Sequence, residues 1–213
     1  MPVSPRNEPE LTVDRRGNVP QAIQVPSPNC DARPQRTRIT LIVVHGISLP
    51  PGEFGGDGIL ALFTNRLDTA AHPAYAAIAT LRVSAHFLIR RDGALIQFVP
   101  CGRRAWHAGV SRWRGRERCN DFSIGIELEG TDLLPYTARQ YARLAMLLAA
   151  LAERYPIADI VGHSDIAPGR KTDPGPAFDW ARLRRRAGAL AAADARARRV
   201  HKPAVARGPA NRV

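Results

Sequence analysis

The chain has 213 residues, 45% of them hydrophobic and 23% charged, with a formal net charge of +12. This length suits one globular domain with flanking segments, and the composition is ordinary for a globular protein. No apolar run approaches the ~20 residues that a membrane span requires, which argues against a membrane-spanning helix.

The N-terminal residues contain no apolar stretch of the kind found in secretory signals, so we expect a cytoplasmic protein. The three cysteines, Cys30, Cys101 and Cys119, lie far apart and form no CxxC pair. They cannot all be paired within the chain, which agrees with a reducing compartment. We expect them to be apolar fillers or inert thiols.

The positive charge is concentrated at the C-terminus. Residues 182–213 contain ten Lys or Arg and one Asp, a net charge of +9, which leaves +3 for the rest of the chain. We expect residues 191–213 to be a disordered basic tail and no specific nucleic-acid binding, because the run lacks interleaved aromatic residues. Residues 1–24 are polar and aperiodic and are expected to be a disordered leader, which leaves residues 25–190 as the domain.

The first strong element is a strand. Residues 39–44 are apolar on both parities, a pattern typical of a central strand buried on both faces. It ends at His45, before a loop rich in Pro and Gly and a short helix expected over residues 59–67. Residues 83–89 and 94–99 flank Arg-Asp-Gly and predict a β-hairpin.

The second half alternates strands and helices. Residues 122–128 predict a strand, 137–155 a helix with Thr137 as its N-cap, and 157–161 a short strand that ends before His163. A further helix is expected from residues 178–180 onward. These elements predict an α/β (α+β) fold, a single domain with a central mixed β-sheet flanked by helices.

Two histidines lie where a sheet gathers ligands. His45 closes the buried strand and His163 follows a second strand, so both imidazoles can reach one edge of the sheet. Hydrolytic zinc sites use three N or O ligands and leave one position for water. The third ligand is open between Asp173, which lies in a Pro- and Gly-rich loop, and Asp165, which is close to His163; we favour Asp173.

Five segments together resemble the AmpD-type cytoplasmic N-acetylmuramoyl-L-alanine amidases, a group within the zinc amidase and peptidoglycan-recognition superfamily. They occur in order between residues 25 and 183, and they read VVHGISLPPGEFGG, SAHFLIRRDG, RAWHAG, ERCNDFSIGIELEGTD and GHSDIAPGRKTDPGPAFDW. The resemblance implies hydrolysis of the amide between (1,6-anhydro-)N-acetylmuramic acid and L-alanine of muropeptides, in peptidoglycan recycling.

The resemblance also implies residue roles. His45, His163 and Asp173 would bind Zn²⁺, while Glu127 and Lys171 would be catalytic. General chemistry agrees with this division: a carboxylate can take a proton from a metal-activated water, and a fixed cation can stabilise the oxyanion. Arg82, Trp106 and Arg118 are the implied substrate contacts, since guanidinium groups pair well with the carboxylates of a muropeptide. Family members commonly have Asn after the first zinc histidine, whereas this chain has Gly46.

The remaining histidines are weaker candidates. His72 is expected at the surface, His86 in a structural hydrogen bond, and His201 in the tail. His107 could contact substrate or shape the pocket. A peptidoglycan-binding module without catalysis and an amidase that acts on intact cell wall remain as alternatives, no membrane partner is expected, and the pattern does not indicate an oligomeric state.

Overall fold

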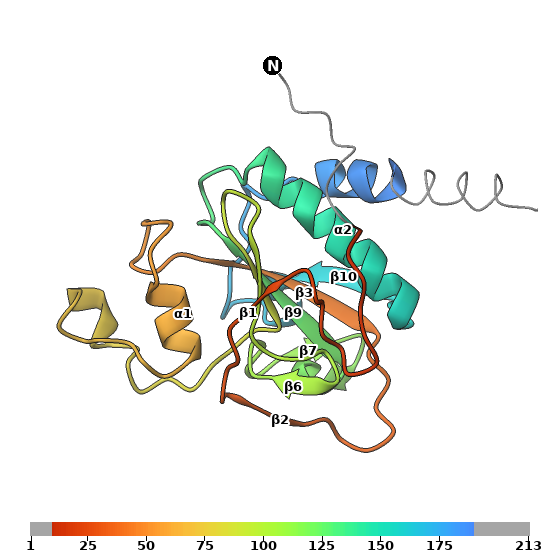
Figure 1. The fold of residues 1–213 in the computed structure, drawn as a ribbon, viewed down its shortest axis with the longest axis horizontal. Helices are drawn as coiled ribbons and strands as arrows, with labels where there is room; N and C mark the ends of the chain where they lie inside the picture. Colours follow the sequence, from red (N-terminus) through yellow and green to blue (C-terminus); the bar gives the residue numbers. More distant parts are fainter. Residues whose placement is uncertain (1–9, 190–213) are drawn as a thin grey trace, which may run out of the picture.

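A computed structural model describes residues 10–189, and six strands form its main sheet in the order β1-β5-β4-β9-β3-β10 (Figure 1). The strands are β1 (Ile23–Gln24), β3 (Leu41–Ile47), β4 (Phe87–Ile89), β5 (Leu95–Gln97), β9 (Ser123–Glu129) and β10 (Asp159–Gly162). Neighbours pair in parallel except for the antiparallel β4–β5 hairpin. The predicted mixed sheet with flanking helices is therefore confirmed.

Smaller elements surround this sheet. Two two-stranded sheets pair β2 (Cys30–Ala32) with β6 (Arg103–Ala105) and β7 (Arg112–Trp113) with β8 (Arg116–Glu117). The helices are α1 (Gly58–Phe63), α2 (Ala138–Arg154), α3 (His163–Ile166) and residues 180–189, with single 3₁₀ turns at Pro73–Tyr75 and Cys119–Asp121. None of the helices within residues 10–189 has the length and apolar content that crossing a bilayer requires.

Helix α2 covers one face of the sheet (Figure 1). Its start is fixed by a capping box, in which Thr137 Oγ1 accepts a hydrogen bond from the Gln140 amide and the Gln140 side chain accepts one from the Thr137 amide. The helix and the sheet share one apolar cluster, which includes Leu144, Leu147, Leu151, Ile42, Val44, Ile124 and Ile126. Burial of each large aliphatic side chain contributes ~1.5–3 kcal/mol.

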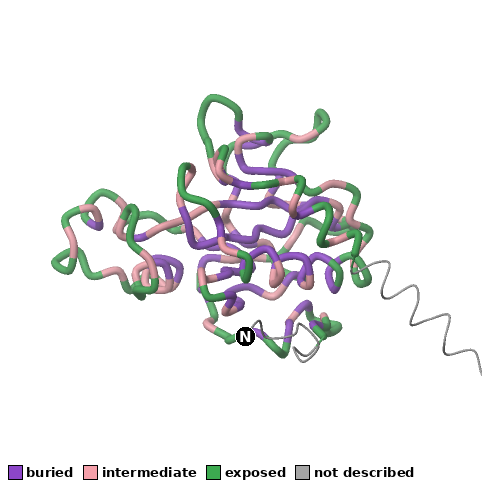
Figure 2. Tube along the Cα trace, turned by 90° about the horizontal axis from the view of Figure 1, so that it is seen from above, coloured by how far each residue is buried: buried purple, intermediate pink, exposed green. Residues whose placement is uncertain are grey.

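The opposite face of the sheet carries the polar residues of interest. Side chains alternate along a strand, so Leu41, Val43 and His45 point away from α2, and Ser123, Gly125 and Glu127 do the same on β9. Figure 2 shows that the central strands are buried while the connecting loops are exposed. A ligand at this face therefore stands on a rigid, buried platform.

The expected disordered leader is wrong for residues 10–24. Leu11, Val19 and Ala22 are buried in the core, and the Val19 amide donates a 2.8 Å hydrogen bond to the Gln97 side chain. Strand β1 then adds to the sheet beside β5. The apolar residues of this segment are few and are interrupted by a polar run that contains Gly17, so no sustained helical or strand period indicated order. Residues 1–9 and the expected basic tail, 191–213, lie outside the described residues.

Candidate metal and catalytic site

Two neighbouring parallel strands deliver the two histidines. β3 pairs with β10 so that Val44 lies opposite Gly162. The residue that follows each of these two is a histidine, His45 after Val44 and His163 after Gly162. Parallel strands end at the same edge of a sheet, so both side chains reach one place. His45 is still within β3, whereas His163 is the first residue of α3.

Three ligand atoms converge at this edge. His45 Nδ1 lies 3.0 Å from His163 Nδ1, and Asp173 Oδ2 lies 3.1 Å from each of them. In a tetrahedral zinc site with bonds of ~2.0–2.2 Å, neighbouring ligand atoms are about 3.3–3.6 Å apart. The nearly equilateral triangle of two imidazole nitrogens and a carboxylate oxygen therefore fits Zn²⁺ after shifts of a few tenths of an ångström.

The two carboxylates that were open as the third ligand have different surroundings. Asp165 Oδ2 accepts a 2.7 Å hydrogen bond from the Gly162 amide and caps α3. Asp173 belongs to the cluster, and its carbonyl oxygen accepts a 2.9 Å hydrogen bond from the Ser164 amide. This bond ties the Pro- and Gly-rich loop to α3, so the carboxylate is held beside His163.

Burial and close contacts shift the pKa values of His45 and Asp173. Burial lowers the pKa of His45 to about 4, which keeps the imidazole neutral as a metal ligand must be. Burial alone would raise the pKa of Asp173, but its contacts with His163 and His45 outweigh this and lower the pKa overall. The donor set is two imidazole nitrogens and one carboxylate oxygen, a combination typical of hydrolytic zinc sites.

Glu127 lies beside the cluster. It pairs in register with His45 on the adjacent strand, its side chain is buried, and its Oε2 atom has no hydrogen-bond partner within the described residues. Burial raises the pKa of Glu127 well above its ordinary value, the charge of Asp173 raises it further, and Lys171 lowers it. A raised carboxyl pKa suits a group that takes a proton near neutral pH.

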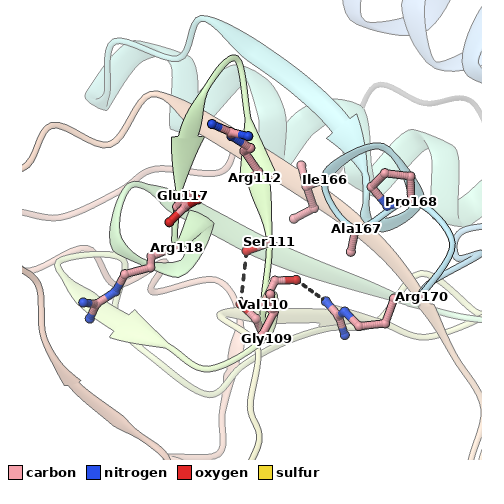
Figure 3. A pocket seen from close by; sticks show the side chains of 10 residues that line it. All are labelled: Gly109, Val110, Ser111, Arg112, Glu117, Arg118, Ile166, Ala167, Pro168 and Arg170. Atoms are coloured by element: carbon pink, nitrogen blue, oxygen red, sulfur yellow. Dashed lines mark hydrogen bonds between the residues drawn. The ribbon is translucent and has the colours of Figure 1, made fainter.

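A cavity of about 250 Å³ reaches the site at His163. Its lining includes His163 and Lys171, together with two of the expected substrate contacts, Arg82 and Trp106. The third expected contact, Arg118, lines a separate, neighbouring cavity of about 530 Å³ (Figure 3). The structure therefore places two of the three expected contacts at the same cavity as His163 and the third one beside it.

Arg170 lines both cavities, and the sequence interpretation missed it. Its guanidinium donates 2.7 Å hydrogen bonds to the carbonyl oxygens of Ala108 and Val110, and the second of these contacts is drawn in Figure 3. The residue could have been suspected because it precedes Lys171 in the same loop. One arginine among so many gives no signal by itself.

The other histidines divide as follows. His72 Nδ1 accepts a hydrogen bond from the Ala74 amide at the turn Pro73–Tyr75. His86 is buried, and its Nδ1 accepts a 3.0 Å hydrogen bond from the Gly125 amide, the structural role expected for it. His107 lines the smaller cavity and contacts His45.

Comparison with known proteins shows the family to which the chain belongs. The family model for N-acetylmuramoyl-L-alanine amidases matches residues 35–176. The chain is 65% identical over 165 residues to the 1,6-anhydro-N-acetylmuramyl-L-alanine amidase AmpD of Escherichia coli, covering 76% of this chain and 90% of the relative. A crystal structure of a selenomethionine derivative of AmpD superposes with a TM-score of 0.78 at 63% identity and covers 80% of this chain and 96% of the other.

A more distant solved structure carries substrate. The N-acetylmuramyl-L-alanine amidase AmiD of E. coli, in complex with anhydro-N-acetylmuramic acid-L-Ala-D-γ-Glu-L-Lys, matches with a TM-score of 0.53 at 31% identity, covering 72% of this chain and 60% of AmiD. The chain therefore belongs to the N-acetylmuramoyl-L-alanine amidase family, and within it to the AmpD type. The expected enzyme class, an N-acetylmuramoyl-L-alanine amidase, is confirmed.

Proposed function

We propose that this chain is a zinc-dependent amidase that hydrolyses the bond between 1,6-anhydro-N-acetylmuramic acid and L-alanine of muropeptides in cytoplasmic peptidoglycan recycling. The observation that carries the proposal is the convergence of His45, His163 and Asp173 beside the unpartnered, buried carboxyl of Glu127. The substrate class is supported by the names of the AmpD relatives and by the anhydro-muropeptide complex of AmiD.

The three ligand residues would hold Zn²⁺, which when bound supplies Lewis-acid polarisation of the amide carbonyl and activation of a water molecule. Glu127 takes the proton from the attacking water, because its buried carboxyl has a raised pKa and a free oxygen. The same group then delivers that proton to the departing amine of L-alanine. Lys171, at the cavity beside His163, stabilises the negative charge that develops on the amide oxygen.

Substrate binding is assigned to the two cavities. Arg82 and Trp106 stand at the cavity that reaches the site, where a guanidinium can pair with a peptide carboxylate and an indole can pack on the sugar or peptide. Arg118 stands in the adjoining cavity, where its exposed side chain lies 3.5 Å from Asp121. A muropeptide lying across both cavities would meet all three side chains.

The test measures zinc stoichiometry and the release of L-Ala peptide from two substrates, a soluble anhydro-muramyl tripeptide and insoluble sacculi. We expect one zinc ion per chain and hydrolysis of the soluble substrate well above that of sacculi. A zinc-loaded protein without turnover would indicate a peptidoglycan-binding module instead. Equal rates on both substrates would indicate an enzyme that acts on intact cell wall.

A further inference from the structure

Four imidazoles contact one another in succession, three of them buried and His107 partly buried, and two of the four belong to the ligand cluster. Ring centroids are 5.7 Å apart from His86 to His107, 5.0 Å from His107 to His45, and 4.4 Å from His45 to His163. His107 lies against β9 at Gly125, where a Cβ atom would stand 2.4 Å from His107 Cγ. The glycine in the middle of a central strand therefore makes room for this ring.

The hydrogen bonds around His107 have only one consistent direction. Ser123 Oγ is 2.6 Å from the carbonyl oxygen of Cys119, which can only accept, so the hydroxyl proton points there. Ser123 Oγ therefore accepts from His107 Nε2, 3.2 Å away, and this nitrogen carries the ring proton. A neutral His107 with its proton on Nε2 has a lone pair on Nδ1.

That lone pair determines the state of His45. His107 Nδ1 lies 2.9 Å from His45 Nε2, so His45 Nε2 is the donor of this contact. The proton of the neutral His45 ring is then on Nε2, and its Nδ1 lone pair faces His163 and Asp173. The chain from Cys119 through Ser123 and His107 thus selects the tautomer in which His45 can bind a metal.

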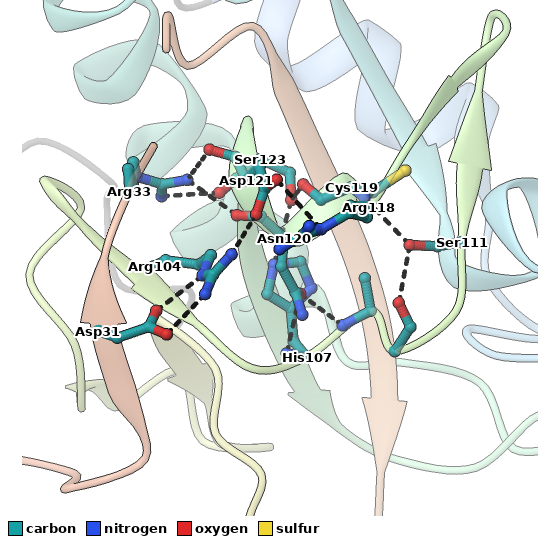
Figure 4. A network of polar contacts seen from close by, with 12 residues as sticks. Asp31, Arg33, Arg104, His107, Ser111, Arg118, Cys119, Asn120, Asp121 and Ser123 are labelled. Atoms are coloured by element: carbon teal, nitrogen blue, oxygen red, sulfur yellow. Dashed lines mark hydrogen bonds and ion pairs between the residues drawn. The ribbon is translucent and has the colours of Figure 1, made fainter. Parts of the chain in front are cut away.

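His163, the second histidine of the cluster, is oriented by Ala108, the residue that follows His107. His163 Nε2 lies 3.2 Å from the carbonyl oxygen of Ala108, which can only accept, so His163 also directs a lone pair on Nδ1 at the cluster. Asn120 Oδ1 accepts hydrogen bonds from the amides of both His107, at 3.1 Å, and Ala108, at 2.8 Å. Figure 4 shows His107, Asn120 and Ser123 within one network of polar contacts.

We propose that His107 is a positioning residue, which with Ser123 holds His45 in the Nε2–H tautomer and at the angle that metal binding requires. The inference rests on the proposed metal site, because it concerns how a ligand is prepared. The N–H group of a metal-binding imidazole usually donates a hydrogen bond to a carboxylate or a backbone carbonyl. Loss of such an acceptor lowers the metal affinity by about 10–100-fold. Here the acceptor is a second imidazole, whose own tautomer is set by a serine.

The test uses two variants of nearly the same shape, His107→Asn and His107→Leu. The Asn carbonyl can accept from His45 Nε2, whereas Leu cannot. By competition with a chelator, we expect the Leu variant to bind zinc about 10–100-fold more weakly than the wild-type protein, and the Asn variant to remain within about threefold of it. Ser123→Ala, which removes only the outer link, should fall between them. Equal zinc affinity of the Asn and Leu variants would overturn the proposal.

A second measurement does not depend on how the variants fold. Long-range ¹H–¹⁵N spectra of the zinc-loaded wild-type protein report which ring nitrogen of each histidine carries the proton. We expect Nε2–H for both His45 and His107, and an Nδ1–H signal from His107 would overturn the relay. A wild-type protein that binds no zinc would instead refute the metal site, so the two failures are distinguishable.

Discussion

Gly46, directly after His45, lies against the hydroxyl of Tyr136. A Cβ atom at residue 46 would stand 2.3 Å from Tyr136 Oη, while the next nearest atoms, Pro174 Cα and Tyr136 Cζ, would be 3.5 and 3.6 Å away. The hydroxyl donates a 3.0 Å hydrogen bond to the Pro174 carbonyl oxygen, and its ring is buried. Gly46→Ala therefore requires the Tyr136 hydroxyl to move, which disturbs its hydrogen bond to the loop that carries Asp173.

Two opposing effects determine how much Gly46→Ala changes the folding stability. Gly46 has no left-handed φ, so alanine by itself would stabilise the protein by about 0.4–1 kcal/mol through the unfolded state. Overpacking against a buried ring costs ~1–3 kcal/mol, which leaves a net loss of ~0–2.6 kcal/mol. Tyr136→Phe costs ~1 kcal/mol for the lost hydrogen bond but removes the atom with which the new Cβ collides. In the double variant the remaining contacts are ordinary.

Urea unfolding of the wild-type protein, the two single variants and the double variant measures the coupling. We expect the double variant to be about 0.4–1 kcal/mol more stable than Tyr136→Phe alone, because the collision is gone and the gain from alanine remains. This corresponds to a coupling of ~1–3 kcal/mol in favour of the double variant. Gly46→Ala should also bind zinc more weakly, since a moved Tyr136 hydroxyl disturbs the hydrogen bond to Pro174, the residue next to a ligand. If the two single effects add within about 0.5 kcal/mol, the Tyr136 hydroxyl is not what requires glycine at this position.

Further predictions concern one metal ligand, the catalytic carboxylate and the tail. His45→Ala should lose both bound zinc and turnover, because the affinity depends on the full donor set; zinc analysis that finds a stoichiometric ion in this variant would refute the ligand assignment. Glu127→Gln should keep zinc but lower kcat by about 10²–10⁴-fold. Because the folded-state pKa of Glu127 lies above the unfolded value, the contribution of this group to stability is lost as pH rises through the folded pKa. Glu127→Gln should therefore raise the Tm of the metal-free protein at neutral pH. It should not raise the Tm when the pH is below the ordinary pKa of a glutamate. A gain in Tm that does not depend on pH would contradict this. Truncation after residue 190 should leave kcat/KM on the soluble muropeptide unchanged, and a loss of activity would make the basic segment part of the domain.

Periodicity predicted the main elements because their residues alternate or repeat clearly. The strand Leu41–Ile47, the hairpin around Gly93 and helix α2 all occur where the pattern indicated them. The packed segment 10–24 was missed because its order comes from contacts with residues far along the chain, such as Gln97. Short segments with three apolar anchors carry no periodic signal for such contacts.

By itself, the sequence determined the fold class, the family and the two histidines at strand ends, because these depend on local pattern and on ordered motifs. Spacing favoured Asp173 over Asp165 as the third ligand, and the family resemblance implied the same choice. The tertiary structure gives the physical difference, since Asp165 bonds to its own helix end while Asp173 returns across the loop to the imidazoles. Nothing in the sequence indicated the contact between His107 and His45. The two residues are 62 positions apart, and the contact depends on the space that Gly125, which has no side chain, leaves for the His107 ring. Spacing along the chain indicates which residues share a strand edge; which atoms face one another depends on how distant segments pack.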